Sequence, residues 1–319
     1  MSFPSDSRGA ASVTPAMRQY LDAKQQNRDA ILFFRMGDFY EMFYEDALVA
    51  ARALDLTLTS RSKDSAGGAI PMCGVPFHAA DGYVARLVKK GFRVAICDQI
   101  EDPKKAKGVV KRAVVRVVSP GTLTDAGYLD AREPAFLMAV APVFAKDGMT
   151  LDKLGAALLD LSTGEFGAAE YAGADGLQAL QDEFAVLRPR ELIAPTDTGI
   201  VGRLPVVGEL SLPVTEVDAW TFEHESARHV LLDQLQTSGL EGFGLDRHTA
   251  AVRAAGALVH YLRATQKVDL AHVRAIAYRQ RADAVLIDPT TLKHLEVVEG
   301  TEGGRSGPLL DELDRAVAS

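Results

Sequence analysis

The sequence predicts an α/β protein with two domains and the start of a third. Its 319 residues are too many for one ordinary core. With 47% hydrophobic and 24% charged residues, the composition is that of a soluble globular protein. Short apolar runs of strand length alternate with segments of helical periodicity, which is typical of layered α/β domains. We place a first domain at 1–120, a linker at 121–133, a second domain at 134–268 and a domain that is cut off early at 269–319.

The first domain opens with clear local signals. Thr14 as N-cap and Pro15 at the first helical position predict a helix that ends before Asp29. The apolar run 30–36 has the length of a strand and is followed by a Gly-Asp turn. A second helix is predicted over 39–55, where apolar residues recur at helical spacing.

The rest of the first domain continues to alternate. One segment is expected to be irregular because it holds two prolines and a glycine. The predicted order is strand, polar loop, irregular segment, helix, strand, basic loop and strand, at 56–60, 61–68, 70–78, 79–90, 92–99, 101–108 and 109–122.

The second domain begins with strands and continues with mixed elements. Ser162-Thr163-Gly164 is predicted to be the turn of a hairpin. Strands are predicted at 135–144, on both sides of this turn within 154–171, and at 191–195, with helices at 175–188, 219–238 and 247–264. A new apolar pattern starts near residue 281 and stops at residue 319.

Charge is distributed unevenly along the chain. The formal net charge is -8, yet residues 1–120 hold 18 basic against 13 acidic side chains, while residues 121–319 hold 17 against 30. Within residues 84–118 ten basic side chains stand against three acidic ones. Such a concentration creates a local positive potential that the whole-chain charge hides. The first domain is therefore a candidate for binding nucleic acid.

Several classes of protein are disfavoured. No apolar run approaches the ~20 residues that a membrane span needs, and the first residues lack the apolar region of a signal peptide. Cys73 and Cys97 have no CxxC partners, so we expect reduced, buried thiols and a cytoplasmic protein. The histidines show no metal-ligand spacing, and the glycines of 300–307 lack the ending of a phosphate-binding loop.

The stretch Phe39-Tyr40-Glu41 has two interpretations. It could be an ordinary helix start, with Asp38 as N-cap and Glu41 completing a capping box. Alternatively, Phe39 could project as a flat wedge of the kind that enters DNA from the minor groove. Glu41 would then accept a hydrogen bond from a base edge, because phosphate would repel it.

Three long blocks of the first domain carry a resemblance that favours the second interpretation. They are GDFYEMFYEDA, IPMCGVPFHAADGYVARLVKKGFRVAICDQIEDP and KRAVVRVVSPGT. They resemble the mismatch-recognition domain of the MutS family of DNA mismatch-repair proteins, whose Phe-x-Glu motif Phe39 and Glu41 match. Later blocks, GAALLDLSTGEF, LEGFGLDRHTAAVRAAGALVHYLRATQ and RAIAYRQRADAVLIDPTTLKHLEVVEGTEG, are similar to the connector domain and to the start of the helical core domain. The resemblance covers essentially the whole chain.

The resemblance implies a fold and a set of site residues. The first domain would have a mixed sheet, the connector would be ribonuclease H-like, and the helical core domain would be truncated. Phe39 would stack on a mispaired or unpaired base and Glu41 would hydrogen-bond it, while Tyr40 packs inward. The DNA backbone would contact basic side chains, namely Arg61, Lys63, Lys111 and Arg112, with Met36, His78, Lys104, Lys105 and Lys107 as weaker candidates.

The resemblance also implies what the chain lacks. The family's lever, clamp and Walker-type ATPase domain do not match any part of this sequence. We therefore expect no enzymatic activity and no cofactor in this chain, since ATP and Mg²⁺ belong to the full-length family, and no dimer through the missing regions. Expected partners are double-stranded DNA with mismatches or small insertion/deletion loops, bound weakly, and a MutL-like protein at the connector. The expected location is the cytoplasm, in association with the nucleoid.

Two alternatives remain open at this point. A metal-dependent nuclease could use Asp160 and Glu165 beside the hairpin turn, although such chemistry needs three or four carboxylates around two Mg²⁺ ions. A protein-interaction segment with an inert DNA surface is the other alternative. Mg²⁺-dependent cleavage that is lost in Asp160→Ala would distinguish the nuclease.

Overall fold

The structure is a computed structural model that describes most of the chain. Its described residues are 14–63, 68–101, 108–123, 135–173, 175–266, 270–280, 291 and 294–295, without the side chains of 61–63 and 266. The chain divides into two compact units. The first unit comprises Met1–Pro134 and Tyr261–Leu270, and the second comprises Ala135–His260 and Ala271–Ser319.

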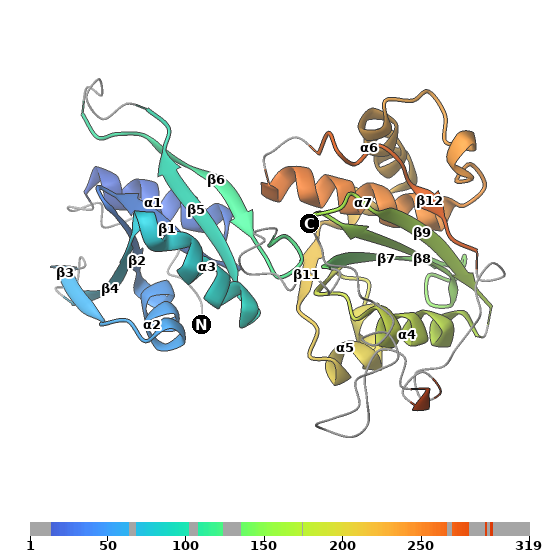
Figure 1. Cartoon of the computed structure of the whole chain (residues 1–319), viewed down its shortest axis with the longest axis horizontal. Helices are drawn as coiled ribbons and strands as arrows, with labels where there is room; N and C mark the ends of the chain where they lie inside the picture. The colour runs from blue at the N-terminus through green and yellow to red at the C-terminus, as the bar shows by residue number, and fades with distance from the viewer. Residues whose placement is uncertain are drawn as a thin grey trace. The chain divides into compact units, whose positions relative to one another are not determined.

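A six-stranded mixed sheet forms the centre of the first unit (Figure 1). The strand order is β3-β4-β2-β1-β5-β6. Only β1 and β5 pair in parallel, and the other neighbours are antiparallel. The strands span Ala30–Met36 (β1), Phe39–Phe43 (β2), Thr59–Lys63 (β3), Ala69–Pro76 (β4), Arg93–Gln99 (β5) and Arg112–Val118 (β6).

Helices cover both faces of this sheet. Helix α1 (Pro15–Gln26) packs on one face, where Tyr20 joins the core of Leu32, Phe34 and Phe43. Helices α2 (Tyr44–Leu54) and α3 (Ala80–Lys89), the latter preceded by the 3-10 turn η1 (Phe77–Ala79), pack on the other face. Strand β1 serves both cores because alternate side chains point to opposite faces.

The start of the chain forms the predicted helix. The Thr14 hydroxyl accepts a hydrogen bond from the Met17 N–H at 3.3 Å, and Pro15 occupies the first turn. This arrangement satisfies one of the otherwise unpaired N–H groups of the helix end. The predicted strand 30–36 and the helix and strand expected at 79–90 and 92–99 are also confirmed, within one or two residues.

Asp46, a buried carboxylate, ties α1, β1 and α2 together. It accepts hydrogen bonds from Lys24 Nζ at 2.8 Å, from the Tyr20 hydroxyl at 3.2 Å and from the Leu32 N–H at 3.0 Å. Burial and the nearby Asp46 charge raise the pKa of Tyr20 well above its usual range, so the phenol remains a donor. A buried carboxylate with this many partners fixes the position of α1 on the sheet.

The helix predicted over 39–55 is wrong in its first five residues. Phe39–Phe43 forms strand β2, which pairs antiparallel with β1 and with β4, and the helix begins only at Tyr44. Asp38 is therefore no N-cap, and Glu41 makes no capping box. Two apolar runs separated by Gly-Asp are a hairpin signal, and the pairing with two neighbouring strands outweighs the weak helical periodicity.

The segment 70–78 is also more regular than predicted. Most of it belongs to β4, which lies between β3 and β2. Its prolines are tolerated because Pro76 ends the strand and Pro71 lies opposite Ser60, next to an irregularity in the β3–β4 register. The strand predicted at 56–60 is shifted to Thr59–Lys63, so the first residues of the expected polar loop belong to β3. The last strand is shorter than predicted and begins at Arg112.

A second mixed sheet of six strands organises the second unit. Strands β7, β8 and β9 form an antiparallel meander, and β10, β11 and β12 join it with parallel pairings. The strand order is β11-β10-β7-β8-β9-β12. Their bounds are Phe136–Phe144 (β7), Leu151–Asp160 (β8), Phe166–Ala172 (β9), Glu191–Pro195 (β10), Val214–Val217 (β11) and Ala277–Tyr278 (β12). The predicted hairpin turn at 162–164 joins β8 to β9.

Helices again complete the layers of the second unit. The predicted helices at 175–188 and 247–264 are confirmed as α4 and α7, whereas that at 219–238 is divided into a 3-10 turn and a shorter α-helix. The bounds are Gly176–Leu187 (α4), Val201–Arg203 (η2), Pro205–Glu209 (α5), Ala219–Phe222 (η3), His224–Leu235 (α6), Glu241–Phe243 (η4) and Thr249–Gln266 (α7). Phe184 of α4 is fully buried against the sheet.

Helix α7 approaches its neighbours so closely that only glycine fits at two contacts. A Cβ atom on Gly155 of β8 would lie 1.9 Å from the Ala250 carbonyl oxygen, and one on Gly256 would lie 2.3 Å from the Ala227 carbonyl oxygen. Backbone atoms cannot yield as a flexible side chain can. These glycines therefore set the distances of α7 from β8 and from α6.

Other predictions concern the cysteines and the end of the chain. Cys73 and Cys97 are free and buried, as predicted, and burial raises the pKa of Cys73 to about 11. Among the described residues, no helix is both long enough and apolar enough to cross a membrane. The pattern that starts near residue 281 lies outside the described residues, apart from 291 and 294–295.

Replacing Asp46 by alanine should destabilise the first unit. The change leaves the buried Leu32 N–H without its acceptor and removes the ionic partner of Lys24, which keeps its bond to the Ala30 carbonyl, so we expect the free energy of unfolding to fall by about 3 kcal/mol. Urea-induced unfolding measures this loss. Asp22→Ala, on the exposed side of the same helix, is the matched control and should change stability by less than about 0.5 kcal/mol. Equal effects of both variants would contradict the role given to Asp46.

Gly155→Ala should destabilise the second unit by about 3 kcal/mol, because α7 must move away from β8 to admit the methyl group. Thermal or urea unfolding of the chain measures the change. Gly202→Ala is a suitable control, since a Cβ atom there would meet nothing within 4 Å. A fully stable Gly155→Ala variant would show that the close approach is not required.

Candidate nucleic-acid interface

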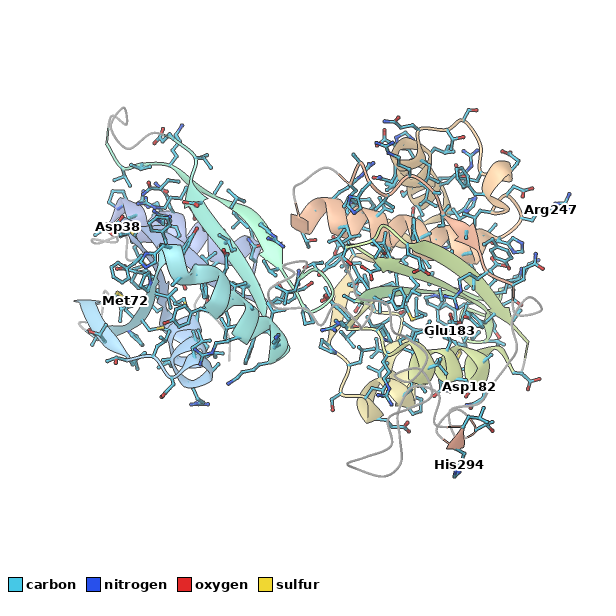
Figure 2. The ribbon with its side chains drawn as sticks, viewed as in Figure 1. Asp38, Met72, Asp182, Glu183, Arg247 and His294 are labelled. Atoms are coloured by element: carbon cyan, nitrogen blue, oxygen red, sulfur yellow. The ribbon has the colours of Figure 1, made fainter. Side chains whose placement is uncertain are left out.

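Phe39 lies at the tip of the β1–β2 hairpin and is exposed to solvent. The two-residue turn Gly37-Asp38 joins Met36 to its partner Phe39, and Gly37 has a φ of 61°, which glycine adopts at little cost. The Phe39 side chain is 47% exposed, an unusual position for a phenylalanine. Asp38 marks this tip at the outer margin of the first unit (Figure 2).

Tyr40 points to the opposite face and packs inward, as predicted. It is buried in the α2–α3 core, and its hydroxyl donates a hydrogen bond to Asp98 Oδ2 at 3.0 Å. Burial and the Asp98 charge raise the pKa of Tyr40 to about 12. This anchored ring fixes the residue between Phe39 and Glu41, so both of their side chains leave the strand on the other face.

Glu41 shares the face of Phe39 but lies deeper. Its side chain is only 8% exposed, and the residue pairs with Phe34 on one side and with Gly74 on the other. It lines a pocket of about 310 Å³ on the α1 face of the sheet, which is otherwise lined by Thr14, Ala16, Met17, Tyr20, Phe34, Met36, Phe43 and Met72. Phe39 and Glu41 thus lie on one face of strand β2, where the ring is exposed and the carboxylate is recessed.

Arg35 and Phe77 meet at the same tip. The Arg35 guanidinium lies 3.8 Å from the centre of the Phe77 ring, and its Nε donates to the Gly37 carbonyl at 2.5 Å. The Phe77 N–H donates to the Asp38 carbonyl at 3.0 Å. Neither residue was predicted as part of the site, because Arg35 and Phe77 are far apart in the chain and meet only through strand pairing.

Two of the predicted backbone-binding residues are described in full. Lys111 is exposed, and its own N–H donates to Glu101 Oε1 at 2.6 Å. Arg112 is half-buried, with Nε donating to the Arg35 carbonyl at 2.6 Å and Nη1 to the Val110 carbonyl at 2.8 Å. Burial lowers the pKa of Arg112, against an opposing contribution from Cys97. The Arg112 side chain is thus engaged in hydrogen bonds within the fold, whereas Lys111 is exposed.

Most of the remaining predicted contacts lie wholly or partly outside the described residues. The side chains of Arg61 and Lys63 lie outside the described residues, although their backbone belongs to β3. Lys104, Lys105 and Lys107 lie outside the described residues altogether. His78 is exposed and meets Phe77 edge-on, with ring centres 5.9 Å apart, while Met36 lines the pocket of Glu41.

Asp160, the residue of the nuclease alternative, has a structural role. Its Oδ1 accepts from the Ser162 N–H at 2.8 Å and from the Ser162 hydroxyl at 2.5 Å, and its Oδ2 accepts from the Ala135 N–H at 3.3 Å. Burial acts to raise the pKa of Asp160, but these hydrogen bonds outweigh it and the pKa is lowered. Glu165 is exposed across the turn. Within the described part of the chain no three acidic, histidine or cysteine side chains group as a metal site.

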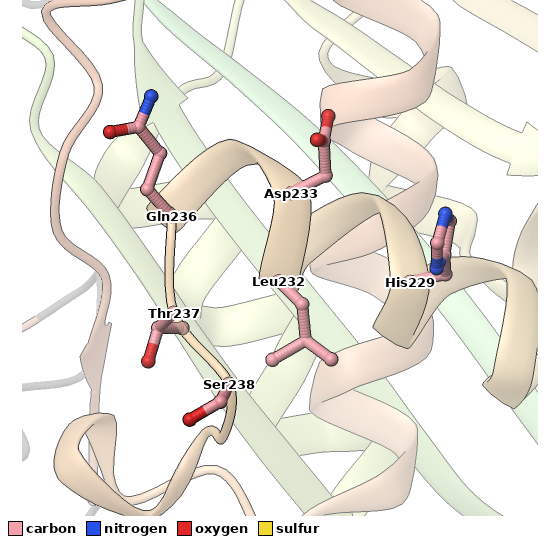
Figure 3. Close-up of a pocket in the computed structure, with 6 residues that line it drawn as sticks. All are labelled: His229, Leu232, Asp233, Gln236, Thr237 and Ser238. Atoms are coloured by element: carbon pink, nitrogen blue, oxygen red, sulfur yellow. The ribbon is translucent and has the colours of Figure 1, made fainter.

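The second unit has an open pocket of about 580 Å³ at the end of α6. It is lined by His229, Leu232, Asp233, Gln236, Thr237 and Ser238. Their side chains come from the last turns of α6 and from the segment that follows it, and they do not converge on one point (Figure 3). This pocket therefore offers no catalytic constellation.

Comparisons with known proteins agree on one family. The family models described as MutS domain I and MutS domain II match residues 14–127 and 135–274. Proteins named DNA mismatch repair protein MutS are similar to this chain. That of Symbiobacterium thermophilum is 44% identical over 313 residues, 97% of this chain and 35% of the relative. That of Solibacter usitatus is 45% identical over 286 residues, 90% of this chain and 31% of the relative.

A third relative gives the same result. The protein of that name from Desulfatibacillum aliphaticivorans is 43% identical over 313 residues, 97% of this chain and 34% of the relative. The chain thus spans about a third of the length of these curated relatives. The two domain matches follow each other in the order of the two units. The chain belongs to the MutS family and carries its domains I and II.

Proposed function

We propose that the first unit recognises mispaired and unpaired bases in double-stranded DNA, and that the chain thereby serves DNA mismatch repair. The observation that carries the proposal is the exposed Phe39 ring at a fixed hairpin tip, two residues from the recessed carboxylate of Glu41. The names of the similar proteins support a role in DNA mismatch repair, and the excess of basic side chains in residues 1–120 supports DNA as the ligand.

In this proposal Phe39 selects a site by its deformability. A ring inserted from the minor groove must separate two stacked base pairs, which costs a few kcal/mol. The cost is smallest where pairing is already faulty, so the same ring binds a mismatch more readily than an intact duplex. The tight turn at Gly37 supports this role because a fixed ring loses little freedom on insertion.

Glu41 adds discrimination by electrostatics. Its carboxylate is repelled by DNA phosphates and gains only when a base edge offers a donor. In an intact duplex the Watson–Crick donors are paired within the stack and few donors face the minor groove, so repulsion dominates, whereas a displaced base can present its Watson–Crick donors to the carboxylate. The recessed position of Glu41 supports this division of roles, since an approaching base reaches Phe39 first.

Affinity without sequence preference would come from the basic residues. Contacts of lysine and arginine with phosphates release counterions and carry no sequence information. Lys111 is the best described candidate, and Arg61, Lys63, Lys104, Lys105 and Lys107 are further candidates. Arg112 would act mainly through its bonds to the carbonyls of Arg35 and Val110.

The second unit would connect this sensor to the rest of the protein. We propose a ribonuclease H-like connector without catalytic activity that contributes to docking of a MutL-like partner. ATP hydrolysis, clamp closure and dimer formation would belong to parts of the full-length relatives outside the matched third. On this proposal the chain binds DNA without acting as an enzyme.

Phe39→Ala should abolish discrimination while sparing the fold. Base–aromatic stacking contributes about 1–3 kcal/mol, so we expect affinity for mismatched DNA to fall roughly tenfold or more, to the level of matched DNA. Fluorescence anisotropy at low salt measures binding to matched, G·T and single-base-insertion duplexes. Leu48→Ala, an exposed apolar residue on α2, is the control. Equal wild-type affinity for all three duplexes would refute the proposed sensor.

Lys111→Ala should weaken binding to every duplex alike. Loss of one phosphate contact should reduce the slope of log affinity against log salt by about 0.9 and leave the ratio between duplexes unchanged. Titrations at several salt concentrations measure both quantities. Lys146→Ala, an exposed lysine of the second unit, is the control. A loss confined to mismatched duplexes would show that Lys111 takes part in recognition instead.

A further inference from the structure

We propose that Arg35 and Phe77 form a brace that holds the hairpin tip and thereby positions Phe39 for mismatch recognition. The proposal rests on the proposed function and identifies two positioning residues for it. Neither residue would have to contact a base. Their task would be to keep the Phe39 ring in one orientation before DNA arrives.

The brace closes the tip from three directions. Arg35 Nε donates a hydrogen bond to the carbonyl of Gly37, the first residue of the turn, at 2.5 Å. The Phe77 N–H donates a hydrogen bond to the carbonyl of Asp38, the second residue of the turn, at 3.0 Å. The Arg35 guanidinium then covers the Phe77 ring at 3.8 Å, which joins the two holding groups to each other.

The places of Arg35 and Phe77 in the sheet explain how both residues contact the Gly37-Asp38 turn. Arg35 is the last residue but one of β1, and Phe77 follows directly after Pro76, which pairs with Phe39. The turn therefore has β1 on one side and the end of β4 on the other. Arg112 supports the first side, because its Nε donates to the Arg35 carbonyl at 2.6 Å. The main chain of Arg35 is thereby held in place, and the brace orders the hairpin tip beyond it.

The brace explains why a phenylalanine is exposed at position 77. Phe77 is 43% exposed, yet its ring is covered on one face by a planar cation and contacts His78 at its edge. Arginine suits this role better than lysine, since a planar guanidinium can stack and still direct Nε to a carbonyl. The cation beside the tip would also attract DNA, so the experiment must separate positioning from charge.

The experiment compares Arg35→Lys, Phe77→Leu, the double variant and Phe77→Tyr in the 319-residue chain. Arg35→Lys keeps the charge and loses the stacked plane, while Phe77→Leu loses the ring and keeps the charge. We expect each single variant to reduce the ratio of mismatched to matched affinity about fivefold, with no further loss in the double variant. Phe77→Tyr should retain the ratio. The salt slope should stay unchanged in all of them.

Hydrogen exchange tests the brace without DNA. The Phe77 amide should exchange about fivefold faster in Arg35→Lys, because the opening of the tip becomes easier, while amides of β5 stay unchanged. Arg86→Lys is the matched control, since its guanidinium lies 5.8 Å from the centre of the Tyr83 ring on α3. That variant should alter neither the Phe77 amide nor the affinity ratio.

The outcomes are distinguishable. Unchanged exchange at Phe77 in Arg35→Lys would overturn the brace, whatever the DNA results. Faster exchange with an unchanged affinity ratio, or additive losses with a reduced salt slope, would overturn its positioning role. If the wild-type chain itself showed no preference for mismatched duplexes, the proposed function would fail, and the exchange result would still decide whether the brace orders the tip.

Discussion

The two-residue turn between β1 and β2 is the constraint on which the candidate site depends. A turn of this length fixes the register of the hairpin, so Met36 pairs with Phe39 and the alternation of β2 follows from that pair. Phe39 and Glu41 then share one face, while Tyr40 enters the opposite core. A shift by one residue would bury Phe39 and expose Tyr40. The site is thus specified by strand register, which the sheet enforces on both sides of β2.

The two faces of this sheet are stabilised differently, and the difference suits the proposed role. The α2–α3 face is an apolar core, and near the tip it also holds the Tyr40–Asp98 hydrogen bond and the Arg35 guanidinium, 5.6 Å from the centre of the Tyr40 ring. The α1 face carries two acidic groups, Asp46 with its donors and Glu41 in its pocket. Asp46 is used to fasten α1. The Glu41 carboxylate, recessed beside the exposed Phe39 ring, can serve recognition because the firmly attached α1 keeps this face of the sheet rigid.

Much of the fold could be predicted from local signals in the sequence. Thr14 and Pro15 marked the first helix, and the Ser-Thr-Gly turn marked the β8–β9 hairpin. The segment 39–43 was assigned wrongly because its aromatic residues fit both a helical and an alternating pattern. Gly37-Asp38 is the signal that distinguishes the two patterns, because a two-residue turn of this kind joins two paired strands. Prolines at 71 and 76 hid β4, since only the pairing partners show where a strand tolerates them.

The residues of the candidate site were predictable to a different degree. Phe39 and Glu41 follow from a motif of three residues together with the resemblance of the blocks around it. The brace could not be predicted, because Arg35 and Phe77 come together only through the pairing of β1, β2 and β4. Likewise, nothing local distinguishes Lys111, which is exposed, from Arg112, which holds two carbonyl groups. Solvation and tertiary contacts separate such neighbours.

Selection of a binding site by the deformability of the DNA can be measured with one series of duplexes. The duplexes share one sequence and differ only at a central position, from a matched pair through weaker mispairs to a single unpaired base. The measurement is the binding free energy of the chain plotted against the free energy of opening that position, at one salt concentration. If Phe39 selects deformable sites, binding should strengthen steadily as opening becomes easier, and the slope should vanish in Phe39→Ala. A flat wild-type series, or a slope that survives the loss of the Phe39 ring, would contradict this role of Phe39.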